Sequence, residues 1–322
     1  MFVLRQILNL LRSPQTGSVI CWMVVQLFSP ASSVCQTPRP MRVAVLDFGS
    51  SATGVRVASQ IRGALSGKTI TSSGETTQEF DTVDRDQARA AALGSGFDGS
   101  LNMTLAEARD LGAAIGCDFF IMGDAQTVRR SPSSGAVYYE AFASIFLVSA
   151  RSGKLTQWER PDFQRPTPAE AEQALLASLA AEETRQRYAR AIRSAQEEER
   201  IGRAHAIDAV TPVIEVMSDD EAGPDSATRP PRPFRRLKPL YTESASHADA
   251  QATVDVLVDI DARGEVGSIE VARWAGYGLD QSVVDTVKQM HFFPAMREGL
   301  AIPMRVLLRY NFRKPPLQNR LQ

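Results

Sequence analysis

A proline-rich segment in the middle of the chain argues against one continuous domain. Residues 208–235 contain five prolines and the acidic cluster Asp219, Asp220 and Glu221, with almost no periodic apolar pattern. Such a segment buries too little apolar surface to offset the entropy of ordering it. We therefore predict an extended and mobile linker over residues 208–235. The 322 residues, 43% of them hydrophobic, suffice for two ordinary domains around it.

The amino-terminal segment has the pattern of a targeting signal. Two arginines precede a short apolar stretch, residues 18–28, and small residues follow it. A membrane-spanning helix needs about 20 apolar residues, and this stretch is shorter. We therefore predict that residues 1–35 are a signal peptide, cleaved between Ala31 and Gln36. An uncleaved anchor is the alternative, and lipidation at Cys35 is a minor one.

Residues 41–166 have the pattern of an α/β domain. An apolar run at residues 41–48 predicts a buried strand, and helical spacing follows at residues 55–65. Thr104 and Glu107 form the capping-box pattern of a further helix. Three more strands are predicted at residues 118–128, 137–150 and 155–159.

A long charged helix is predicted next, over residues 167–207. Thr167 and Pro168 give an N-cap and a first helical position, and Glu170 completes the cap. The segment is rich in Ala, Glu, Gln and Arg. Because its apolar face is thin after Tyr188, we expect that part to be a solvated helix projecting from the domain.

The hydrophobic pattern of residues 236–316 predicts a small α+β domain. Strict alternation over Ala252–Ile260 indicates a half-buried strand, and residues 265–274 return as its hairpin partner. Apolar residues at helical spacing follow from Leu279 to Met290. A last strand has apolar residues on one side from Met304 onwards. The order is β-β-α-β, with the helix lying across an antiparallel sheet, so the predicted fold class of the chain is α/β plus α+β.

The motifs of this last part resemble the TonB carboxy-terminal domain family. The family opens with Lys-Pro-x-Tyr-Pro, which residues 238–241 match, with Thr242 in place of the second proline. Its hairpin has Asp-x-x-Gly-x-Val, as residues 261–266 do. Its helix begins with Leu-Asp, as at residues 279–280, and its helix exit matches Phe292, Pro294, Ala295 and Gly299, with Met290 in place of a tryptophan. The resemblance implies a periplasmic module that binds partners by strand addition.

The first domain resembles the amino-terminal domain of TolB and the curli-secretion lipoprotein CsgG. The residues that carry this resemblance are residues 43–48, 83–85 and 113–123, and the turn at residues 152–154. It implies a fold and leaves the function of this domain open.

The last strand is the candidate partner-binding site. In the TonB family a partner segment pairs with the edge of this strand, so main-chain hydrogen bonds supply the affinity. We therefore assign partner binding to Arg305, Leu307, Arg309, Asn311 and Arg313. The arginines either attract an acidic partner segment or guard the edge against unwanted pairing.

No catalytic, cofactor or metal site is predicted. The three histidines, His205, His247 and His291, are scattered, and neither glycine-rich turn continues into a phosphate-loop signature. Cys117 has the sequence context of a buried small residue. With 36 Lys and Arg against 37 Asp and Glu, the charge indicates no nucleic-acid partner. We expect a protein that is not an enzyme.

These patterns lead to one functional hypothesis and one alternative. The hypothesis is a TonB-like periplasmic adaptor that binds an outer-membrane receptor or another envelope protein by strand addition and takes part in energised transport. The alternative is a non-energised structural or assembly factor of the envelope that binds proteins through both domains. The N-terminal segment is the predicted route to any membrane association.

Overall fold

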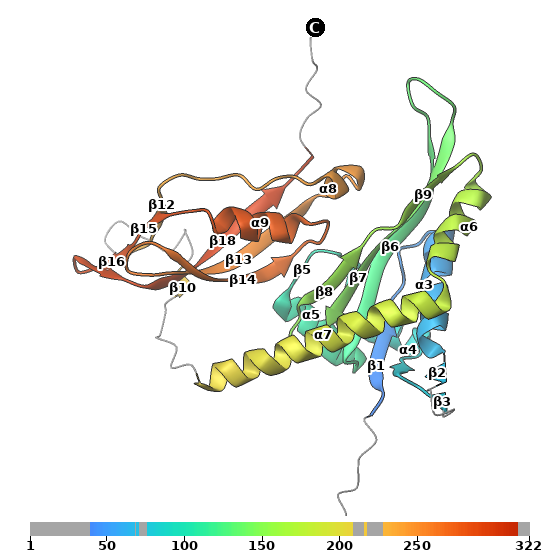
Figure 1. The fold of residues 1–322 in the computed structure, drawn as a ribbon, viewed down its shortest axis with the longest axis horizontal. Helices are drawn as coiled ribbons and strands as arrows, with labels where there is room; N and C mark the ends of the chain where they lie inside the picture. The colour runs from blue at the N-terminus through green and yellow to red at the C-terminus, as the bar shows by residue number, and fades with distance from the viewer. Residues whose placement is uncertain (1–38, 68, 71–75, 209–215, 218–227, 315–322) are drawn as a thin grey trace, which may run out of the picture. The chain divides into compact units, whose positions relative to one another are not determined.

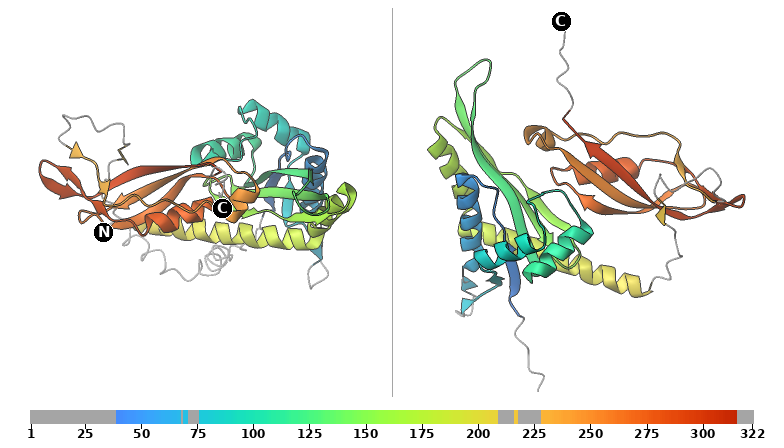
Figure 2. Two further views of the ribbon diagram at one scale, coloured as in Figure 1. Left: turned by 90° about the horizontal axis from the view of Figure 1, so that it is seen from above. Right: turned by 180° about the vertical axis from the view of Figure 1, so that it is seen from behind.

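Two sheets organise the chain in the computed structural model, which describes residues 39–67, 69–70, 76–208, 216–217 and 228–314 (Figure 1). The predicted signal peptide, residues 1–35, lies outside the described residues. Both sheets are twisted, as two further views show (Figure 2).

The first sheet has the strand order β4-β1-β6-β7-β8, and β9 also pairs with β7. Strand β1 is parallel to β4 and β6, and the remaining pairs are antiparallel. The first five residues of β6 are buried because helices cover both faces of the sheet. The strands are β1 (Met41–Val45), β4 (Phe80–Thr82), β6 (Phe119–Arg130), β7 (Tyr138–Ser149), β8 (Leu155–Glu159) and β9 (Asp162–Arg165); a short hairpin, β2 (Thr69–Ile70) and β3 (Thr76–Thr77), stands apart from it.

Helices α3 (Ala52–Ser66), α6 (Pro168–Ser178) and α7 (Ala181–Asp208) pack on one face of this sheet. Helices α4 (Arg85–Gly94) and α5 (Leu105–Ile115) pack on the other. The predicted capping box is present at the start of α5. The Thr104 hydroxyl accepts the backbone N–H of Glu107 at 3.1 Å, and the Glu107 carboxylate accepts that of Thr104 at 2.7 Å.

The structure divides the helix predicted over residues 167–207 into α6 and α7. Leu179, at the break, has φ −99° and ψ 31°, and its side chain is fully buried against the sheet. The part expected to project into solvent differs as well, since Tyr188 and Ile192 are buried in the core. The Tyr188 hydroxyl donates to Glu159 at 2.9 Å, and burial raises the pKa of this tyrosine well above its ordinary value. A few large residues at helical spacing were thus enough to bury this face.

The second sheet has the expected β-β-α-β core, built from β13 (Ala252–Ile260), β14 (Val266–Trp274), α9 (Leu279–Val287) and β18 (Met304–Phe312). The alternating valines of β13 pack against Leu279, Val283 and Val287 of α9. Short elements complete the domain: α8 (Glu243–His247), β15 (Phe292–Phe293), β16 (Ala295–Arg297) and β17 (Leu300–Ile302).

The end of the predicted mobile linker belongs to this second domain. Strand β11 (Thr228–Arg229) pairs with β16, and β12 (Arg232–Pro233) pairs with β15. Pro231 is buried, and the Phe234 ring stacks on Phe293 with the ring centroids 4.0 Å apart. Pro233 therefore lies in an edge pairing, where a missing amide is tolerated, and Pro231 lies between the two short strands. Of residues 209–227, only β10 (Val216–Met217) is described.

Candidate partner-binding edge

Strand β18 lies next to the last position of the second sheet, whose full order is β10-β18-β13-β14-β5, and its outer neighbour β10 has two residues. Strand β18 pairs with β13 along its whole length without a register shift, from Met304 opposite Ile260 to Phe312 opposite Ala252. Its even-numbered residues face α9, and Met304, Val306 and Phe312 are buried there. Its odd-numbered residues therefore share the opposite face.

Two predicted site residues, Arg305 and Arg309, form ion pairs within their own sheet. Arg305 lies directly across from Asp259 and donates to both carboxylate oxygens, at 2.5 and 2.8 Å. Arg309 lies across from Asp255 and donates to both of its oxygens, at 2.8 and 3.0 Å. The hydrogen bonds from Arg305 lower the pKa of Asp259 below its ordinary value. Both guanidinium groups therefore neutralise carboxylates of the neighbouring strand.

The other predicted residues divide between the strand and its end. Leu307 is half-buried across from Leu257, and the side-chain oxygen of Asn311 accepts the Thr253 hydroxyl at 2.8 Å. Both lie on the face that Arg305 and Arg309 share. Arg313 is exposed and follows the end of β18.

Sequence reasoning treated these arginines as outward-facing and missed their partners. The signal was available, because Asp255 and Asp259 have the same spacing in β13 as Arg305 and Arg309 have in β18. Equal spacing on the same parity in two antiparallel strands aligns both pairs in a single register.

A groove of about 140 Å³ lies beside the α9-facing side of β18. Its lining includes Pro231 and Pro233 from the ordered end of the linker, Arg236 just after it, and Val306, Leu308 and Tyr310 from β18. Strand-adding sites gain specificity from pockets that take alternate side chains of the added strand. The lining of the groove combines apolar side chains with the charged residues Arg236 and Arg309.

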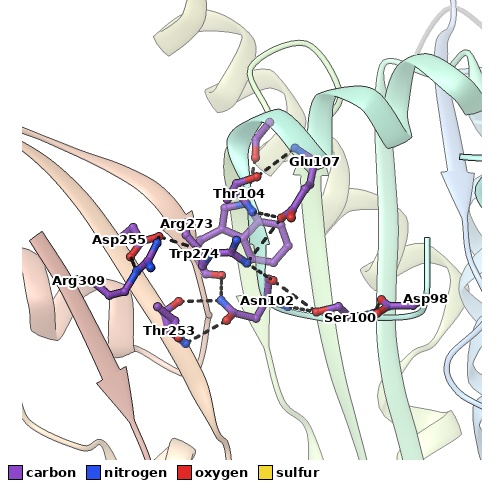
Figure 3. Close-up of polar contacts among 11 residues, drawn as sticks. Asp98, Ser100, Asn102, Thr104, Glu107, Thr253, Asp255, Arg273, Trp274 and Arg309 are labelled. Carbon is purple, nitrogen blue, oxygen red and sulfur yellow. Dashed lines mark hydrogen bonds and ion pairs between the residues drawn. The ribbon is translucent and has the colours of Figure 1, made fainter. Parts of the chain in front are cut away.

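The opposite edge of the sheet is paired with the first domain (Figure 3). Strand β5 (Met103–Thr104) pairs antiparallel with the end of β14, with Trp274 opposite Met103. The Asn102 side chain extends this pairing: its amide donates to the Thr253 and Trp274 carbonyls at 2.8 and 2.6 Å, and its oxygen accepts the Thr253 N–H at 2.9 Å. One side chain thus binds two strands of the second domain.

Trp274 is buried in the core of the first domain, although it belongs to β14 of the second. Its side chain is 1% exposed, and its indole N–H donates to the Gly153 carbonyl at 3.0 Å. The ring lies 6.0 Å from that of Phe146, centroid to centroid. The mobile linker predicted over residues 208–235 would leave the two domains free to move independently. The structure instead joins them by apolar contact and backbone pairing.

A chain of charges connects this junction to β18. Arg273 lies 3.6 Å from Glu107 of the capping box and 3.5 Å from Asp255, which in turn binds Arg309. The Asp255 side chain is only 5% exposed, so two guanidinium groups neutralise one buried carboxylate (Figure 3). The candidate edge is therefore linked to the first domain through polar contacts.

Other chemistry is sparse in the part of the chain that the structure describes. There, no three or more side chains of His, Cys, Asp or Glu are placed to hold a metal ion, and no helix has the length and apolar character of a membrane span. Burial raises the pKa of the Cys117 thiol to about 12, which keeps it protonated at neutral pH. Asp47, two residues beyond the end of β1, is 3.1 Å from Arg85 and 3.9 Å from Arg89.

Comparison with known proteins bears on the second domain. Residues 238–313 match the family model described as the Gram-negative bacterial TonB protein C-terminal. A search of curated proteins found no match. The comparisons give no support to the resemblance of the first domain to TolB and CsgG.

Three solved structures were among the matches. They are the solution structure of the Pseudomonas aeruginosa TonB C-terminal domain (21% identity, 30% of this chain and 92% of that one, TM-score 0.24), the LpoB C-terminal domain from Salmonella enterica (13%, 39% and 83%, 0.27), and the hypothetical protein CT253 from Chlamydia trachomatis (12%, 45% and 96%, 0.31). At these scores the family match is the stronger finding. Residues 238–313 are thus similar to the TonB C-terminal domain, and this similarity supports an envelope adaptor that binds proteins.

Proposed function

We propose that this protein is a TonB-like periplasmic adaptor that binds an outer-membrane partner by adding an extended segment of that partner to the edge of β18. The observation that carries the proposal is the place of β18 within the family match: it is paired over its full length on its β13 side and, among the described residues, over two residues on its other side. On the opposite side of the sheet, the end of β14 pairs with β5.

The side-chain contacts of β18 support a backbone-mediated mode of binding. Arg305 and Arg309 are held by Asp259 and Asp255, so their charges are largely compensated within the sheet. Main-chain N–H and C=O groups then supply the affinity, and the groove beside Leu308 and Tyr310 selects a side chain of the partner. The arginines guard the edge and set its register.

A pair of proline variants tests this mode. Amides of neighbouring residues in a strand point to opposite sides, so one of Leu307 and Leu308 donates toward β13 and the other points to the open edge. Proline at the outward amide leaves the fold intact and weakens binding of peptides that copy the periplasmic ends of outer-membrane receptors, by roughly tenfold for one lost hydrogen bond and its steric cost. The variants are Leu307→Pro and Leu308→Pro, measured by calorimetric titration.

Alanine at the same two positions is the matched control, because it shortens the side chain and keeps the amide. Circular dichroism identifies which proline variant remains folded. If that variant binds the receptor peptides as tightly as its alanine counterpart, strand addition at β18 is wrong.

The alternative function, a non-energised assembly factor, is favoured by the junction. Asn102 and Trp274 attach the binding domain to the first domain, which suits a factor that presents two protein-binding surfaces together. The two versions differ in one measurable property. Cross-linking of an energised adaptor to its receptor in cells changes when the proton gradient is collapsed, whereas that of an assembly factor does not.

A further inference from the structure

The outer edge of β18 is already occupied at one end by a segment of the same chain. The backbone of β10 runs parallel to β18, with Val216 opposite Arg305 and Met217 opposite Val306. In the described part of the chain, no other strand pairs on this side, so the edge from Leu307 to Phe312 is left unpaired. We refer to Val216 and Met217 as the cis strand.

We propose that the cis strand is an intramolecular competitor that a partner segment must displace from β18. This inference rests on the proposed function, because it concerns the same edge. The occupant also indicates the chemistry of the partner: an extended peptide that runs parallel to β18. In sequence, the cis strand follows Val213 and Ile214 and precedes an acidic cluster, so a β-branched segment with acidic flanks is the class of peptide expected.

The geometry gives displacement a starting point. The cis strand covers the edge at Arg305 and Val306, near the beginning of β18, and the following residues of the strand are unpaired on that side. A partner can pair first with the backbone from Leu307 onwards and then extend toward Arg305. Because the cis strand is tethered, its effective concentration at the edge is high, and only a segment that gains more pairing than two residues displaces it.

Removal of the cis strand therefore raises the apparent affinity for a partner. The apparent affinity for a partner equals the affinity of the open edge multiplied by the fraction of molecules in which the edge is open. For a cis strand paired in about nine molecules of ten, its removal strengthens partner binding roughly tenfold.

The first test removes the two amides of the cis strand with the double variant Val216→Pro and Met217→Pro in the full chain. Hydrogen exchange at the amides of Arg305, Val306 and Leu307 reports the state of the edge without any partner. Faster exchange at the outward amides of this stretch is expected. The control is Ala222→Pro, which adds a proline elsewhere in the same segment. Unchanged exchange in the double variant overturns the proposal.

The second test locks the edge. In a chain whose native cysteines are replaced by alanine, Val216→Cys and Arg305→Cys place two thiols at directly opposed positions. The probe is a synthetic peptide that copies residues 211–221 of this chain. The oxidised protein is expected to bind it more weakly, because only the edge from Leu307 onwards stays open, and reduction restores the stronger binding. Arg305→Cys alone controls for the lost ion pair with Asp259. Equal binding by the oxidised and reduced forms contradicts the proposal.

Different results would contradict strand addition at β18 and competition by the cis strand. If receptor peptides bind neither the parent nor the double proline variant, the proposed function is wrong, while hydrogen exchange still reports whether the cis strand covers the edge. If receptor peptides bind the parent and the double variant equally well, the edge is a binding site and the cis strand is no competitor.

Discussion

At the residue scale, the buried carboxylate of Asp255 determines what the neighbouring charges do. It is 5% exposed and lies between Arg309, which donates two hydrogen bonds, and Arg273, at 3.5 Å. A buried carboxylate left without a partner is costly, so these guanidinium groups are required by the fold. Arg309 is therefore expected to matter more for stability than for attraction of a partner.

Replacement of Arg309 by alanine is expected to lower the free energy of unfolding by about 1–2 kcal/mol, the usual range for a hydrogen-bonded charge on a half-exposed residue. Asp255→Asn removes the carboxylate charge that Arg309→Ala leaves without its partner. The double variant is therefore expected to lose less free energy of unfolding than the sum of the two single variants. Urea denaturation of the four proteins gives the coupling. Additive losses would show that the pair is not coupled, and Arg313→Ala, beyond the strand, is the control.

Asp280 gives the second domain a pH dependence. Its carboxylate accepts the backbone N–H groups of Ala275 and Gly276, both at 2.8 Å, and burial raises its pKa from 3.8 to about 6. Desolvation, the first cause, outweighs the hydrogen bonds, which act in the opposite direction. This residue is the aspartate of the Leu-Asp pair at the start of α9, and it closes the loop between β14 and the helix.

The direction of this pH dependence follows from the linkage between protonation of Asp280 and folding. Because the folded pKa exceeds the unfolded one, the folded state binds more protons between about pH 4 and pH 6, and stability falls as the pH rises through that range. The decrease is on the order of 1–3 kcal/mol. Asp280→Asn removes this dependence while it keeps one acceptor. Urea denaturation of the parent and of Asp280→Asn at pH 4, 5, 6 and 7 tests it. The free energy of unfolding of the parent relative to the variant is expected to fall as the pH rises, and a relative stability that rises with pH would contradict the raised pKa.

At the element scale, local patterns predicted most elements, and long-range pairings were missed. The capping box at Thr104 and the alternation of β13 are visible within a few residues of sequence, because caps and period-two faces are local properties. Asn102, two residues before the same cap, gives no such signal. Its partners Thr253 and Trp274 lie far away in the chain, and only the fold brings them together.

The linker is a second case in which the sequence pattern did not reveal a long-range pairing. Proline content predicted an extended segment over residues 208–235, and an extended backbone is also what β11 and β12 need in order to pair. Composition alone does not distinguish a free extended chain from one that is paired at a sheet edge. The ordered groove beside β18, lined by Pro231 and Pro233, could not be predicted for this reason.

At the scale of the whole molecule, the junction decides whether two domains unfold as one. Asn102→Ala leaves the Thr253 N–H and the Trp274 carbonyl without their partner, at a cost of about 1–3 kcal/mol. We expect one calorimetric transition for the parent and two for this variant. Asn311→Ala, which removes a single exposed side-chain bond, keeps one transition. Two transitions in the parent would show that the junction does not couple the domains.

The pairing of β5 with β14 also determines whether the second domain can be studied in isolation. A fragment beginning at Thr228 lacks β5 and Asn102, so the backbone of Arg273 and Trp274 at the end of β14 loses its neighbour, and an indole that is 1% exposed in the full chain is uncovered. An unpaired edge beside an uncovered aromatic ring is a template for edge-to-edge self-association. A dimer of the excised domain would therefore be a product of excision and would say little about the oligomeric state of the intact protein.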